Sequence, residues 1–274
     1  KLELSPRLLC VCEMVRRGAC IADIGTDHAF VPIYLMEHKI VPSALAMDIG
    51  KGPLLAAEEH IKEHGLEKYI TARQSDGVLA LQDGEADSVI IAGMGGALVI
   101  KILSEGRERL RNVKELILQP QSEVEKVRHF LYESGYHITA EEMVFEDGKY
   151  YPMMHAVPGR DDTVYPESYF KYGGWLIREK NEVLLRYLEK EEREKRQLIS
   201  EKKERAEMEA SYVWRDLHQL ENEAEQLKRS CEEKRREWES WVNEDKKRKK
   251  REEAAGYFAG WRIHPLEAVS VGDI

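Results

Sequence analysis

The chain has 274 residues, enough for one large domain or for a compact domain with an appendage. Charged residues make up 34% of it, against roughly 25% in an average globular domain, and the formal net charge is −9. This balance excludes a protein coated in basic surface. A local site for nucleic acid is not excluded, because electrostatic steering depends on where charge lies rather than on its sum.

The composition predicts neither a membrane span nor an export signal. The longest apolar runs, such as residues 88–92, are as long as a strand, whereas a membrane helix needs roughly 20 apolar residues. The first residues lack the basic cap and apolar core of a signal peptide. The four cysteines lack the paired spacing of a zinc site or a disulfide framework. We therefore expect reduced thiols, no metal and a cytoplasmic location.

Short apolar runs alternate with amphipathic stretches over the first 160 residues, which is typical of strands followed by helices. Ser5-Pro6 predicts an N-cap with proline at the first helical position. Helices are expected at residues 6–15, 31–38, 53–65, 96–105 and 123–134. Strands are expected at residues 19–24, 43–49, 69–74, 88–92 and 116–118. Two further strands, 136–144 and 150–157, flank Asp147-Gly148, a pair typical of tight hairpins.

Five strand–helix units imply a parallel, doubly wound α/β sheet. The terminal hairpin adds an antiparallel strand, which nicotinamide-binding Rossmann domains do not usually have. We therefore expect the class I (Rossmann-like) methyltransferase sheet, with strand order 3-2-1-4-5-7-6 and a terminal antiparallel hairpin.

A helical appendage is predicted after this sheet, since residues 175–255 contain neither Gly nor Pro. Apolar residues from Val213 to Trp241 follow alternating steps of four and three, which indicates a coiled-coil seam. An earlier apolar stripe from Ile177 to Ile199 indicates a first helix, so we expect an antiparallel helical hairpin. The expected parts are a ligand-binding domain at residues 1–160, a C-terminal helical coiled-coil domain at 161–255, and a tail at 256–274.

Acids and glycines follow four successive strands, at the edge where open α/β sheets bind ligands. The candidate cofactor-binding residues there are Asp23, Gly25, Asp48, Gln74, Asp76, Gly77, Gly93 and Met94. A dinucleotide fingerprint needs three glycines beside a pyrophosphate, and only Gly25 is present after the first strand. S-adenosylmethionine has no phosphate, and its sulfonium cation suits the carboxylates. Asp48 is then placed for the ribose hydroxyls and Asp76 for the adenine amino group, although Asp23 as a turn cap and Asp48 as a surface acid remain alternatives.

Several short motifs resemble those of the bacterial tRNA adenine-N1 methyltransferases that act on position 22. They are residues 22–29 (ADIGTDHA), 48–54 (DIGKGPL), 75–77 (SDG), 91–96 (IAGMGG), 116–120 (LILQP) and 146–150 (EDGKY). The resemblance covers roughly residues 2–190. It implies S-adenosylmethionine as donor, N1 of a tRNA adenine as acceptor, and a C-terminal coiled-coil domain. It also places Asp27 and His28 at the donor pocket or its mouth, with the glycines and acids above.

Methyl transfer to adenine N1 requires no general base, because N1 carries a lone pair and no proton. Positive charge develops on the base, and a fixed carboxylate would stabilise it in the transition state. Asp27 is the catalytic candidate, and an N-cap for the next helix is the alternative. The predicted substrate-binding residues are Arg16, Arg17 and Lys51 for phosphates, Gln119 for the base, and Tyr151 for stacking. The basic run 246–251 is either a tRNA-backbone contact or a solvated helix end.

Three functions are therefore considered. The first is a tRNA adenine-N1 methyltransferase with tRNA as its partner, and the second is a class I methyltransferase that acts on another nucleobase or a small molecule. The third is a non-catalytic coiled-coil scaffold. A monomer is favoured, without a direct sequence signal for the oligomeric state.

Overall fold

The computed structural model describes residues 2–208 and 214–254. Seven strands form one sheet in the order β3-β2-β1-β4-β5-β7-β6, which confirms the predicted order. The strands are β1 (Ile21–Ile24), β2 (Ala44–Asp48), β3 (Ile70–Gln74), β4 (Ser88–Met94), β5 (Glu115–Pro120), β6 (Tyr136–Glu146) and β7 (Lys149–Pro158). The first five are parallel, and β7 pairs antiparallel with both β5 and β6.

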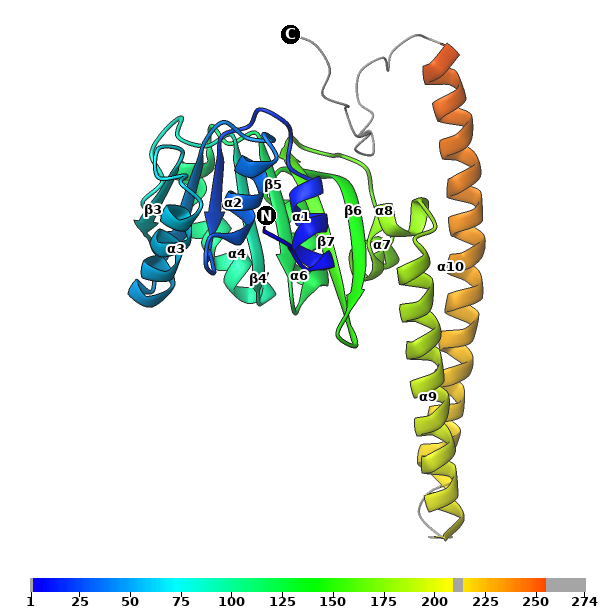
Figure 1. Ribbon diagram of the computed structural model, residues 1–274. Helices are drawn as coiled ribbons and strands as arrows, with labels where there is room; N and C mark the ends of the chain where they lie inside the picture. Colours follow the sequence, from blue (N-terminus) through cyan, green and yellow to red (C-terminus); the bar gives the residue numbers. More distant parts are fainter. Residues whose placement is uncertain (1, 209–213, 255–274) are drawn as a thin grey trace. The chain divides into compact units, whose positions relative to one another are not determined.

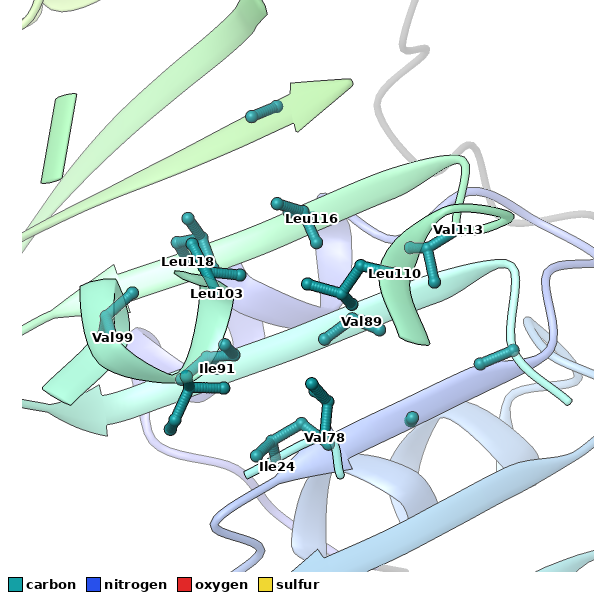
Figure 2. Close-up of a cluster of buried hydrophobic side chains, with 14 of the residues drawn as sticks. Ile24, Val78, Val89, Ile91, Val99, Leu103, Leu110, Val113, Leu116 and Leu118 are labelled. Atoms are coloured by element: carbon teal, nitrogen blue, oxygen red, sulfur yellow. The ribbon is translucent and has the colours of Figure 1, made fainter. Parts of the chain in front are cut away.

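Helices cover both faces of the sheet (Figure 1). They are α1 (Pro6–Glu13), α2 (Phe30–Glu37), α3 (Lys51–Glu63), α4 (Gly96–Glu105), α5 (Arg107–Leu110), α6 (Val124–Glu133), α7 (Glu167–Tyr172), α8 (Gly174–Arg178), α9 (Glu182–Met208) and α10 (Trp214–Ala254). Residues of α1, α2 and α3 bury one face of the strands, and residues of α4, α5 and α6 bury the other. Figure 2 shows the second of these cores, in which Ile91 of β4 lies toward Val99 and Leu103 of α4, and Ile24 of β1 lies beside Val78. Strands buried on both faces explain the continuous apolar runs of the sequence.

Local signals fixed several element ends as expected. The Ser5 side chain accepts a hydrogen bond from the Leu8 N–H and caps α1. Asp147 and Gly148 both have positive φ, 48° and 77°, as the two central residues of a type I′ hairpin turn require. This turn sets the register in which Glu146 faces Lys149.

Three features differ from the prediction. Strand β4 continues past Gly93 to Met94, with a register shift between Ala92 and Met94. The short helices α5, α7 and α8 were not predicted, since four to six residues are too few to show a helical period. Ile177 belongs to α8 rather than to the long helix after it, because Asn181 caps a new helix with hydrogen bonds from the Val183 and Leu184 N–H groups.

The long helices confirm the helical character of the C-terminal region. Residues Lys1–Arg196 form one compact unit, and a second unit begins at Gln197. The basic run 246–251 lies within α10. Coiled-coil pairing and the division at residue 160 stay predictions, while Val213 and the predicted tail lie outside the described residues. Within the described part of the chain, no helix has the length and apolar character to cross a membrane.

A buried ion pair joins α7 and α8 to the sheet. Arg128 of α6 donates from Nε to Glu141 Oε1 of β6 at 2.7 Å, and the two side chains are 2% and 0% exposed. Arg128 also donates to the carbonyls of Phe170 and Lys171, and Glu141 accepts from the Trp175 N–H at 3.0 Å. Arg128 Nη1 and Glu141 Oε2 therefore anchor the chain that follows the hairpin.

Replacing Arg128 by alanine should destabilise the protein by about 3–5 kcal/mol, because the Glu141 carboxylate is left buried without its cation. Urea unfolding followed by tryptophan fluorescence measures this change. Lys126→Ala is the matched control, since Lys126 is an exposed residue of the same helix that pairs with Glu123. An equal unfolding midpoint for the two variants would contradict the assigned role of Arg128.

Candidate functional site

The strand order reverses at β1, which has the parallel neighbours β2 on one side and β4 on the other. The carboxyl ends of these strands therefore open onto one crevice, where open α/β sheets bind ligands. The last residues of β1, β2, β3 and β4, together with the loops after β1 and β3, carry all of the predicted cofactor-binding residues and Asp27.

Gly25 lets the chain turn directly after β1. Its φ is +73°, and its N–H donates to the Met47 carbonyl of β2 at 2.7 Å. The terminal methyl group of Met94, from the end of β4, occupies the place that a Cβ on Gly25 would take. The backbone angle therefore favours glycine here, and a side chain at this position would displace the Met94 methyl group.

Asp23 is buried beneath this turn. Its Oδ2 accepts a hydrogen bond from Thr26 Oγ1 at 2.7 Å, so the side chain does brace the turn. The pKa of Asp23 is raised to about 6, mainly by burial, with a smaller contribution from the charge of Asp48, while the Thr26 hydrogen bond opposes the rise. Asp23 thus places a carboxyl group under the crevice, and a nearby cation would offset the effect of burial on its charged form.

Asp48 ends β2 and is held by its own loop. Its Oδ1 accepts from the Gly50 N–H at 2.6 Å, while Oδ2 has no hydrogen-bond partner among the described residues. Gln74, at the end of β3, donates from Nε2 to the Ile49 carbonyl at 2.9 Å and so links the two loops. The exposed Ile49 and the oriented Asp48 together offer an apolar face and a free acceptor.

The loop after β3 presents Asp76 to solvent. Ser75 stabilises this loop, since its hydroxyl donates to the Gly77 carbonyl at 2.7 Å and accepts from the Ala80 N–H. The Ser75 N–H donates to the Asp48 carbonyl at 2.9 Å, which places Asp76 beside the β2 loop.

Asp27 points away from the helix that follows it. The N-cap of α2 is Ala29, with no side-chain hydrogen bond, so the N-cap alternative for Asp27 is wrong. The Asp27 side chain is 82% exposed, and its carboxylate lies 3.2 Å from Nε2 of His28. His28 stacks on Phe30 and makes a tilted ring contact with His60, and its buried Nδ1 has no hydrogen-bond partner in the described structure.

The side-chain amide of Gln119, which was predicted to bind the substrate base, joins the ends of β4 and β5. Gln119 is fully buried, and its Oε1 accepts from Arg7 Nη1 at 2.9 Å and from the Gly93 N–H at 3.1 Å. The Arg7 guanidinium lies over the Tyr151 ring, 5.4 Å from its centroid. Gln119 therefore supports the crevice from below. Arg7, which the sequence favoured as a solvated charge near the cleft, is mostly buried and belongs to the same cluster.

Two of the predicted phosphate-binding residues, Lys51 and Arg16, lie at opposite ends of the parallel strands. Lys51 begins α3 just after Asp48, on the side of the crevice. Arg16 lies near the opposite edge, where its Nε is 3.9 Å from Glu115 at the start of β5. Arg16 therefore lies at the amino ends of the strands, because α1 begins beside the crevice and the loop after it reaches those ends. Phosphate binding by Arg16 and Arg17 stays a prediction.

The crevice fits a sulfonium-bearing nucleoside. The turn at Gly25 leaves no side chain beside Met94, Asp48 has a free acceptor oxygen, and Asp23, Asp27 and Asp76 add negative charge. In the described turn after β1, Gly25 is the one glycine, whereas a diphosphate-binding turn has three. Elsewhere among the described residues, Glu125, His129 and Glu167 lie close enough together to share a metal ion, and none of them was a predicted site residue.

Comparison with known proteins supports this interpretation. Residues 4–154 match the family model described as "Methyltransferase domain". The chain is 39% identical over 190 residues to the tRNA (adenine(22)-N(1))-methyltransferase of Bacillus subtilis strain 168, covering 68% of this chain and 80% of that protein. The crystal structure of the B. subtilis M1A22 tRNA methyltransferase has a TM-score of 0.69 and 33% identity, covering 84% of this chain and 99% of that one.

A second solved structure contains the methyl donor. It is a Streptococcus pneumoniae protein, assigned as a candidate tRNA (m1A22) methyltransferase, in complex with S-adenosyl-L-methionine. Its TM-score is 0.68 and its identity 34%, covering 73% of this chain and 92% of that one. The extent of these matches confirms the resemblance seen in the sequence. The chain belongs to the methyltransferase domain family and, within it, to the tRNA (adenine(22)-N(1))-methyltransferases.

Proposed function

We propose that this protein transfers the methyl group of S-adenosylmethionine to N1 of the adenine at position 22 of tRNA. The observation that carries the proposal is the joint occurrence of the crevice acids and the match to the B. subtilis enzyme over most of both chains. A tRNA substrate and four free cysteines also support the predicted cytoplasmic location.

The donor would be held by residues from four loops. Asp48 offers its free oxygen to the ribose hydroxyls and Asp76 accepts from the adenine amino group, while Gly25 and Met94 border the methionine moiety. The other residues proposed to line the donor site are His28, Gln74, Gly77 and Gly93. When bound, S-adenosylmethionine supplies an electrophilic methyl group on a sulfonium centre. The buried Asp23 favours that cation without contacting solvent.

The protein's main task is to align N1 with the methyl group, because N1 needs no base to become a nucleophile. N1 takes part in base pairing, so the target nucleotide must be unpaired or flipped, at a cost of a few kcal/mol if it is stacked. Asp27 lies exposed at the switch point, where its charge would stabilise the cationic base that forms. Lys51 is available for a phosphate, and Tyr151 lies on the acceptor side with Arg7.

The function is tested with methyl-labelled S-adenosylmethionine and unmodified bulk tRNA, followed by digestion to nucleosides. We expect label in 1-methyladenosine alone, and a reverse-transcription stop at position 22, because a methyl group on N1 blocks pairing. Label in another nucleoside would indicate a different base specificity. Donor binding without any labelled tRNA would favour a small-molecule substrate, and no donor binding would favour a scaffold.

Asp48→Ala should weaken donor binding about tenfold or more, because a carboxylate that accepts from hydroxyl groups contributes roughly 1.5–3 kcal/mol. Isothermal titration calorimetry with S-adenosylmethionine measures the change. Asp83→Ala is the control, since Asp83 is an exposed acid that pairs with Arg111. Unchanged affinity in Asp48→Ala would remove Asp48 from the proposed donor site.

Asp27→Asn should lower kcat roughly a hundredfold, because it keeps the shape of the side chain and removes the charge that opposes the cationic base. Donor affinity should stay the same. Single-turnover methylation and calorimetry on the same variant separate the two quantities. An equal loss of turnover and donor affinity would reassign Asp27 to donor binding.

A further inference from the structure

The end of β4 contains an irregularity that aims one side chain into the crevice. The register with β5 shifts between Ala92 and Met94, and Gly93, between them, has a φ of +82°. Bulges of this kind redirect the side chains beside them. Here Met94 follows the irregularity, and its methyl group lies directly over Gly25.

The Gly93 N–H donates to a side chain of the neighbouring strand β5 rather than to a backbone carbonyl. It donates to Oε1 of the fully buried Gln119, and Nε2 of the same amide donates to the Pro120 carbonyl at 3.3 Å. An amide oxygen accepts two hydrogen bonds, and the second donor is Arg7 Nη1. A flipped amide would set its NH₂ group against both donors, so Arg7 and Gly93 together fix its orientation.

Arg7 is itself held in place by the hairpin. Its backbone N–H donates to Glu146 Oε1 at 3.3 Å, its Nε lies 3.8 Å from Glu146 Oε2, and its guanidinium covers the Tyr151 ring. The side chain is only 20% exposed. Arg7 thus connects the start of α1, the hairpin tip and the end of β5 through one guanidinium.

We propose that Arg7 is a positioning residue of the transferase. It locks the Gln119 amide, and the locked amide holds Gly93 and keeps Met94 over Gly25. Arg7 acts through Gln119 and does not contact the reacting atoms. The kinetic consequence rests on the proposed function, whereas the lock itself is a property of the folded chain.

Arg7→Met and Gln119→Leu should each lower kcat about tenfold to a hundredfold, since a displacement of about 1 Å in a reacting group has an effect of that size. The KM values for tRNA and donor should change little. Because both residues act on one amide, the double variant should be no slower than the slower single variant. Arg111→Met is the control, since Arg111 pairs with Asp83 on the surface.

A second readout needs no activity. The ¹³C-methyl resonance of Met94, assigned with a Met94→Leu variant, should shift in Arg7→Met and Gln119→Leu but not in Arg111→Met. Arg7→Lys keeps one donor for Gln119, so its resonance and kcat should lie between those of Arg7→Met and the unaltered protein. This variant also carries the test if Arg7→Met does not fold.

Three results would overturn the inference. One is an unshifted Met94 resonance in Arg7→Met, and another is a double variant whose loss is the product of the single losses. The third is a raised KM for tRNA at unchanged kcat, which would make Arg7 a direct tRNA contact. If the unaltered protein does not methylate tRNA, the proposed function fails, and the resonance still decides whether the lock exists.

Discussion

Parallel pairing of β1 with strands on both sides determines where this chain can bind a ligand. Each strand of the central group ends at the same edge, so loops that are distant in sequence converge without any contact having to be specified between them. Within each loop, local hydrogen bonds then suffice to orient the side chains. A hydrogen bond from the Gly50 N–H orients Asp48, and a bond from Thr26 to Asp23 braces the turn after β1.

The same arrangement explains why the acids of the crevice differ in character. Asp23 belongs to the strand and is buried, which raises its pKa, whereas Asp27 lies beyond the turn and is exposed. One carboxylate therefore supplies a fixed field from within the protein, and the other is accessible to a bound base. Asp23 and Asp27 differ in this way although they are only four positions apart in the sequence.

Much of this could be predicted from sequence because the decisive signals were local. Ser5 caps its helix, Asp147-Gly148 forms its turn, and the strand order follows once the hairpin is recognised. The cofactor-binding candidates all fell on the predicted edge for the same reason. By contrast, the sequence did not show that Arg7 lies beside the crevice and Arg16 away from it, because the positions of these cations in the chain do not say which end of α1 faces the crevice.

Other features depend on tertiary contacts that cannot be recognised from the periodicity of the sequence. Gln119 has the sequence position of a base-gripping residue, and only its two donors in the folded chain show that its oxygen is already used. Arg128 was indistinguishable from the solvated charges of an amphipathic helix, although it is almost fully buried against Glu141. Burial of a charge is decided by partners that come from elsewhere in the chain.

The Arg128–Glu141 pair has a consequence for how the catalytic part of the molecule can be separated from its extension. Glu141 accepts a hydrogen bond from the Trp175 N–H, and Arg128 donates to the carbonyls of Phe170 and Lys171. The segment after the hairpin is therefore packed against the sheet domain. A protein shortened to residue 160 would expose this charge pair and the apolar surface under Leu176. The compact unit therefore continues past α8 into α9, whose Leu184 is buried in the same cluster as Met143 and Leu176, and it ends at Arg196.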